Sequence, residues 1–132
     1  MESSRDGDHI HQAMSLLEAT CKDAHVLALA YRAAVQRVHH RLDRQRLIAY
    51  GHAAWQLSHR LGESTVVHSI ELTKDVFSTL RELEENVAAE IATLIQLVPA
   101  RERPALECAW CASEARLSWL HAHEAKHVFV NG

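Results

Sequence analysis

The sequence predicts an all-α protein, an antiparallel up-down-up-down four-helix bundle, and three observations lead to that prediction. From Ile10 to Leu42, apolar residues recur at alternating spacings of four and three, which is the period of a helix that packs along one seam. The 132 residues include four glycines and two prolines, so few positions interrupt a helix. The expected connections are short, and short connections favour antiparallel neighbours.

The first expected helix is this long seam. Asp8 would be its N-cap, because a short carboxylate accepts hydrogen bonds from the free amides of a first turn. The helix would end at about Val38–Arg41, where two histidines place polar groups beside its last carbonyls. Its seam comprises Ile10, Met14, Leu17, Cys21, Ala24, Ala28, Tyr31, Val35, Val38 and Leu42.

The second expected helix runs from Asp43 to Gly62. Asp43 would be its N-cap after a tight connection. Gly62 would end it, because glycine readily adopts the positive φ that often follows a helix.

The last two helices follow in the second half of the chain. We expect the third to span Val66–Val98, with a break at Thr73–Lys74 as an alternative. Pro99 would end it. Pro104 would begin the fourth helix at a position where the missing amide costs nothing, and that helix would continue to about Val128.

Glu84 interrupts the apolar seam of the third helix, between Leu80 and Val87. A carboxylate at a core position would lose its hydration unless a partner compensates. Either Glu84 is a polar core residue, or the seam rotates and leaves Glu84 outside. We favour the rotated seam.

Composition restricts the class of protein. One domain is expected, with residues 1–8 as a disordered tail and residues 9–130 as a single four-helix bundle. Fourteen basic against seventeen acidic residues give no electrostatic case for nucleic acid, and no apolar run is long enough for a membrane. Three cysteines, an odd number, fit a reducing compartment better than a disulfide framework. We therefore expect a cytoplasmic protein without nucleic-acid or membrane partners.

One cysteine pattern resembles the spacing of a zinc finger. Cys108 and Cys111 precede His123 and His127 in this chain. In one continuous helix, however, Cys111 and His123 would lie ~18 Å apart, too far to share an ion. Buried thiols beside a core tryptophan, Trp110, are the favoured interpretation.

Eleven histidines are unusual for this length. Strict alternation of helix directions would bring the end of the fourth helix beside the start of the first. A surface cluster at that end, able to bind a transition metal adventitiously, would then comprise His9, His11, His121, His123 and His127.

Short motifs resemble a known family. The stretch Leu16–Asp23, which contains Thr-Cys-Lys-Asp, resembles the first helix of small bacterial ferritin-like four-helix-bundle proteins of unassigned function. Leu80–Glu85 is similar to the acidic run of that family's third helix. Val98–Ala100, followed by Glu107 and Glu114, resembles the start of its fourth helix. The resemblance implies a ferritin-like bundle but not ferritin activity.

The residues of a di-iron centre are incomplete in this chain. Such a centre needs a Glu-x-x-His motif on two helices and two further glutamates, and this chain has one such motif, Glu124–His127. Val87 and Leu117 stand where the resemblance implies a glutamate and a histidine. A partial site could also draw on His25 or His52. The candidate metal ligands are Glu18, Glu84, Glu107, Glu114, His121, Glu124 and His127.

We expect a non-catalytic binding or interaction protein that forms a homodimer and requires no cofactor. One alternative is a degenerate, histidine-rich ferritin-like protein that binds iron or zinc. Another is an adaptor or immunity-type protein that binds one protein partner through a helix face. No nucleophile–base motif or phosphate-binding loop supports an enzyme.

Overall fold

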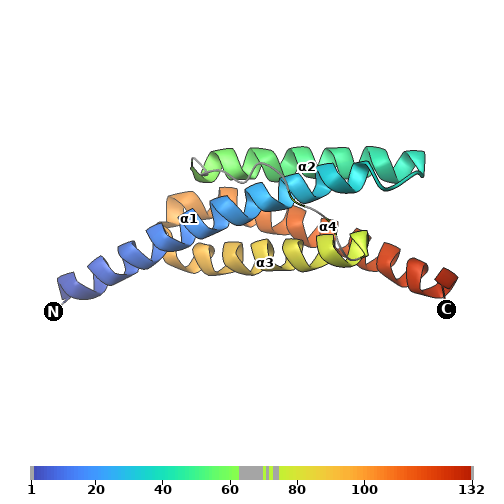
Figure 1. Ribbon diagram of the computed structural model, residues 1–132. Coiled ribbons are helices and arrows are strands. Elements are labelled where there is room, and N and C mark those ends of the chain that lie inside the picture. Colours follow the sequence, from blue (N-terminus) through green and yellow to red (C-terminus); the bar gives the residue numbers. More distant parts are fainter. Residues whose placement is uncertain (1, 63–69, 71, 73–74, 132) are drawn as a thin grey trace.

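Four long helices make up the fold of the computed structural model, which describes residues 2–62, 70, 72 and 75–131. They are α1 (Glu2–Val35), α2 (Arg41–Leu61), α3 (Val76–Leu97) and α4 (Arg103–Asn131), with a short 3₁₀ helix η1 (Ala100–Glu102) before α4. Side chains are described for residues 10–124 within these ranges. The expected all-α four-helix bundle is confirmed (Figure 1).

The helix directions differ from the expected strict alternation. Cys21 of α1 pairs with Ser58 of α2, and Tyr31 with Tyr50, so α1 and α2 are antiparallel. Thr20 of α1 pairs with Glu90 of α3, and Tyr31 with Glu84, so α1 and α3 are also antiparallel. It follows that α2 and α3 are parallel, and Figure 1 shows both running opposite to α1 and α4. The order is up-down-down-up.

The reason for this order is a third helix shorter than predicted. It begins at Val76, and Ile70, Leu72 and Asp75 are not helical; the rest of the stretch from Glu63 to Lys74, including Val66 and the Thr73–Lys74 break, lies outside the described residues. The connection from Gly62 to Asp75 can reach ~43 Å, more than the ~32 Å length of α2. It can therefore return to the other end of the bundle, a crossover that ferritin-like folds also use.

Several helix ends also differ from prediction. The backbone is helical from Glu2, so residues 2–8 lie within a helix where a disordered tail was predicted, and Asp8 is not an N-cap. Helix α1 ends at Val35, and α2 begins at Arg41 with His40 as its N-cap, which places Asp43 in the first turn.

Other ends agree more closely with the sequence. Gly62 ends α2 with a φ of 151°, a value that L side chains rarely adopt. Helix α3 ends just before Pro99, as expected. Pro104 is the second residue of α4, because the turn of η1 precedes that helix. Asp75 is the N-cap of α3, and its carboxylate accepts from the amide of Phe77 at 3.0 Å.

The core lies along the facing stripes of α1, α2 and α3, with leucines of α4 closing it. Small residues bring α1 and α2 close together: a Cβ added at Gly51 would lie 3.1 Å from Cβ of Tyr31. Ser58 donates to the carbonyl of Cys21 at 3.0 Å, and the Cys21 thiol donates to the carbonyl of Ser58 at 3.2 Å. None of the helices in the described ranges is long and apolar enough to cross a lipid bilayer.

Candidate functional site

The centre of the bundle holds a buried polar cluster around Glu84 of α3. The hydroxyl of Tyr31, on α1, donates to Oε1 of Glu84 at 2.7 Å. From α4, Ser113 donates to Oε2 at 2.9 Å, and Nε of Arg116 donates to Oε1 at 2.5 Å. The side chain of Glu84 is fully buried and that of Arg116 is 8% exposed. These four residues are called the Glu84 cluster below.

The Glu84 cluster satisfies its carboxylate from within the protein. Burial raises the pKa of the Tyr31 phenol far above its usual value, and the charge of Glu84 and the hydrogen bond to it raise this pKa further. The phenol therefore stays protonated and donates. Both oxygens of Glu84 have protein donors, and Arg116 balances the charge. The favoured rotated seam is wrong: Glu84 is a polar core residue, stabilised by partners on two other helices.

The predicted metal ligands do not converge on one place. Glu84 faces the bundle centre, whereas Glu18, Glu107 and Glu114 are exposed on α1 and α4. His127 lies in the part of α4 whose side chains are not described. Within the described side chains, no group of three or more histidine, cysteine, aspartate or glutamate residues is placed to hold a metal ion.

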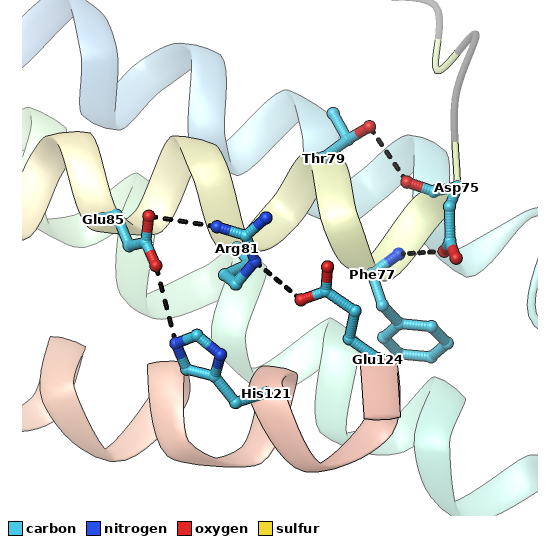
Figure 2. Close-up of polar contacts among 7 residues, drawn as sticks. All are labelled: Asp75, Phe77, Thr79, Arg81, Glu85, His121 and Glu124. Carbon is cyan, nitrogen blue, oxygen red and sulfur yellow. Dashed lines mark hydrogen bonds and ion pairs between the residues drawn. The ribbon is translucent and has the colours of Figure 1, made fainter. Parts of the chain in front are cut away.

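His121 and Glu124 belong instead to a polar network between α3 and α4 (Figure 2). Nε of Arg81 donates to Oε2 of Glu124 at 2.6 Å, and Nη1 of Arg81 donates to Oε2 of Glu85 at 3.1 Å. Nε2 of His121 lies 3.5 Å from Oε1 of Glu85. The hydrogen bond from Arg81 lowers the pKa of Glu124, and the same bond raises the pKa of Arg81. The carboxylates of Glu85 and Glu124 thus already have the guanidinium of Arg81 beside them.

The five-histidine cluster predicted at one bundle end is wrong. Because α1 and α4 are parallel, the N-terminus of α1 and the C-terminus of α4 lie at opposite ends of the molecule (Figure 1). His9 and His11 are therefore distant from His121 and His123.

His123 joins α4 to the first turn of α2. Its Nε2 lies 3.1 Å from Oδ1 of Asp43, and its Nδ1 lies 3.0 Å from the carbonyl oxygen of Trp119. Both ring nitrogens are thus occupied, and the ring lies 3.9 Å from that of Trp119 between centroids. Asp43, expected as a helix cap, serves as the partner of this histidine instead. This geometry indicates a structural role in which His123 holds α4 against α2, because neither ring nitrogen is open to a substrate.

A second carboxylate on α3, Glu90, lies half-buried against α1. Oγ1 of Thr20 donates to Oε2 of Glu90 at 2.8 Å, and Asp23 is close enough to share a hydrogen bond with it. Burial, then the hydrogen bond and negative charge of Asp23, raise the pKa of Glu90 to about 7, although the Thr20 hydroxyl acts in the opposite direction. Near neutral pH, Glu90 and Asp23 can therefore share a proton where α3 packs against α1.

The cysteines differ from the sequence-based interpretation. Cys108 and Cys111 are exposed, and Trp110 is 38% exposed, so these are not buried thiols beside a core tryptophan. Helix α4 continues unbroken from Arg103 to Asn131, which keeps Cys111 and His123 far apart and excludes the zinc-finger arrangement. Cys21 is the buried cysteine.

The outer side of the α1–α2 pair is hollowed into a groove of about 380 Å³. Gly51 leaves its floor open, and Arg32, His52 and Trp55 lie along it. His52, named above as a substitute ligand, therefore faces this groove rather than the bundle centre. His25 packs its ring 5.4 Å from that of Trp55.

No family model, curated protein or solved structure matches this chain.

Sequence reasoning placed Tyr31 on the seam of the first helix but missed the other two partners of Glu84, although a signal for those two exists. Ser113 and Arg116 stand at core-facing positions of α4, between Leu106 and Leu120. A polar residue at a seam position of one helix does not by itself show whether its side chain lies inside or outside the core. Polar residues of complementary charge at seam positions of two helices predict a buried pair, and Glu84 with Arg116 is such a combination.

Proposed function

We propose that this protein is a non-catalytic, ferritin-like helical bundle that acts by binding, and that its protruding N-terminal half of α1 pairs with a second copy of the chain. The observation that carries the proposal is the exposure of Ile10 and Met14, 61% and 60%, on the seam whose middle part, from Cys21 to Tyr31, is buried. Two large apolar side chains on one helix face, open to water, favour association.

The seam is uncovered because α2 is too short to reach it. Helix α2 ends at Leu61, and a Cβ built on Gly62 would lie 3.9 Å from Sγ of Cys21. Met14 and Ile10 precede Cys21 by seven and eleven residues, which places them ~10 and ~16 Å further along α1. Figure 1 shows the N-terminal end of α1 extending beyond the other helices. Among the described residues, the stripe that packs on α2 thus continues without a partner.

A second copy fits this stripe because the stripe is self-complementary. In a two-fold antiparallel pair of α1 helices, Met14 of each copy would face Leu17 of the other. The same register brings His11 of one copy close to Glu18 of the other, with opposite charges when the histidine is protonated. Each contact would then occur twice, once in each direction, as a two-fold interface requires.

The oligomeric state tests the proposal directly. We expect light scattering behind gel filtration to give twice the mass of one chain for the wild type, and the mass of one chain for Ile10→Lys/Met14→Lys. The matched control Gln12→Lys/Ala19→Lys adds the same charge to exposed positions on the opposite face of α1 and should remain dimeric. A monomeric wild type, or equal masses for the two variants, would contradict the proposal.

The non-catalytic part of the proposal is supported by the ion pair at the bundle centre. A di-iron bundle uses inward glutamates as metal ligands, whereas Glu84 is bound to Arg116 at 2.5 Å. We expect anaerobic Fe(II) loading followed by oxygen to yield no stoichiometric iron. Two irons per chain, with an oxo-bridged absorption band that Glu84→Gln abolishes, would favour the alternative of a metal-binding bundle.

A further inference from the structure

A small groove between α2 and α4 has the features of a ligand site. Its volume is about 180 Å³. On the α4 side it is lined by Ala105, Ala109 and Ala112, whose short side chains leave the space open, and by Cys108. Leu57 and Arg60 line it from α2, and Arg116 of the Glu84 cluster lines it as well.

Arg116 brings unused hydrogen-bond donors to this groove. The residue is 6% exposed, and its Nε is bound to Glu84. Within the described part of the chain, that is the guanidinium's one hydrogen bond, so Nη1 and Nη2 have no protein acceptor there. A guanidinium carries five N–H donors, and buried donors without acceptors are costly. A ligand that accepts from Nη1 and Nη2 would remove that cost.

The charges around the groove define the ligand. Arg60 and Arg116 contribute two positive charges, and Glu84 behind Arg116 contributes one negative charge, which leaves an excess of one positive charge. Among the residues that the structure describes, no acidic side chain lines the groove. A monoanion with two coplanar oxygens matches both this charge and the fork of Nη1 and Nη2.

We propose that the groove between α2 and α4 binds a small monocarboxylate, with the carboxylate on Arg116 and the hydrocarbon part against Leu57 and the alanines of α4. A volume of about 180 Å³ corresponds to roughly six water molecules at ~30 Å³ each, so a short-chain or small aromatic acid fits. Arg60, at the exposed side, adds electrostatic attraction. This site is independent of the dimer surface on α1.

Alkylation of Cys108 provides the test, because this exposed thiol lines the groove and Cys111 does not. In the Cys111→Ser protein, we expect butyrate to slow the reaction of Cys108 with iodoacetamide severalfold, and butyramide, its uncharged analogue, to leave the rate unchanged. In the Cys108→Ser protein, butyrate should leave the reaction of Cys111 unchanged.

Two alanine variants locate the effect without disturbing the Glu84 cluster. Ala112→Leu fills the groove and should abolish the protection of Cys108 by butyrate. Ala115→Leu, a matched change at an exposed position of α4 outside the groove, should retain it. Equal effects of butyrate and butyramide, equal protection of Cys111, or protection that survives Ala112→Leu would each overturn the proposal.

Discussion

Helices α3 and α4 are joined by two arginine–glutamate pairs of nearly equal length in very different surroundings. Arg116 and Glu84 lie 2.5 Å apart with side chains 8% and 0% exposed. Arg81 and Glu124 lie 2.6 Å apart with side chains 21% and 24% exposed. Distance alone would rank these pairs as equivalent. Burial separates them, because the inner charges have lost their water and the outer charges have kept much of it.

Removal of one residue from a pair should consequently destabilise the protein to different degrees in the two cases. Tyr31 and Ser113 supply further hydrogen bonds to Glu84, so the inner pair is one part of a cluster that joins three helices. The outer pair is supplemented by Glu85, which is itself 44% exposed. Loss of one partner leaves a buried charge in the first case and a hydrated charge in the second.

The largest effect is expected from Arg116→Met. Without the guanidinium, Glu84 keeps a buried negative charge that two hydroxyls alone must stabilise, and we expect a loss of ~3–5 kcal/mol in the free energy of unfolding. Urea denaturation at neutral pH measures it. A loss below ~1 kcal/mol would mean that the inner pair behaves like a surface pair.

Replacement of the whole Glu84 cluster should reverse most of that loss. The variant Tyr31→Phe/Glu84→Met/Ser113→Ala/Arg116→Met leaves no buried polar group at the centre, and a well-packed apolar replacement of a buried ion pair is often neutral or stabilising. We expect its free energy of unfolding to exceed that of Arg116→Met by ~3–5 kcal/mol, which is the loss caused by the unpaired Glu84. If both variants are equally unstable, shape rather than charge dominates at this position.

The comparison also shows which parts of the fold the sequence could predict. The type and number of the helices follow from the local periodicity of apolar residues within each helix. Ala24 and Ala28, for example, are buried as their seam positions predict. Helix direction depends on whether the connection after Gly62 is short. An apolar pattern from Val66 onward looked helical, yet Ile70 and Leu72 are not helical, and Leu72 is buried with its carbonyl bound by Arg37. Tertiary packing overrode the local pattern there.

The candidate site was harder to predict because it is made between helices. Glu84 stood out in its own seam, but its position inside or outside depends on Arg116, 32 residues away in the sequence. Ile10 and Met14 were predicted to lie on the packed seam, but both are exposed, because their burial depends on where α2 ends. Neither property is encoded within one segment.

Glu90 provides an intermediate case, since its neighbour Asp23 has the same charge. Its pKa of about 7 in the folded state exceeds the usual value of a glutamate, so the folded state binds the proton more tightly. Stability from this group is present at low pH and is lost as pH rises from ~4.5 to about 7. Above that range, Glu90→Gln should be more stable than the wild type by about 1 kcal/mol, a value reduced for solvent screening.

Thermal unfolding across this pH range measures the effect of Glu90→Gln. Glu82→Gln, at an exposed position of the same helix, is the matched control. Parallel stability profiles for the two variants would show that the pKa of Glu90 is not raised in the folded protein.

The smallest effect is expected from Arg81→Met at the outer pair. The lost ion pair should cost ~0.2–1 kcal/mol, and the cost should shrink as salt is added, because exposed charges are screened. Arg81 holds the pKa of Glu124 below its usual value, so its stabilising effect is present above the unfolded pKa and is lost as pH falls. Urea denaturation at low and high salt, together with an NMR titration of Glu124, measures both quantities. If Arg81→Met costs as much as Arg116→Met, then burial does not distinguish the two pairs, and the hydrogen bonds that each arginine makes would have to explain their strength.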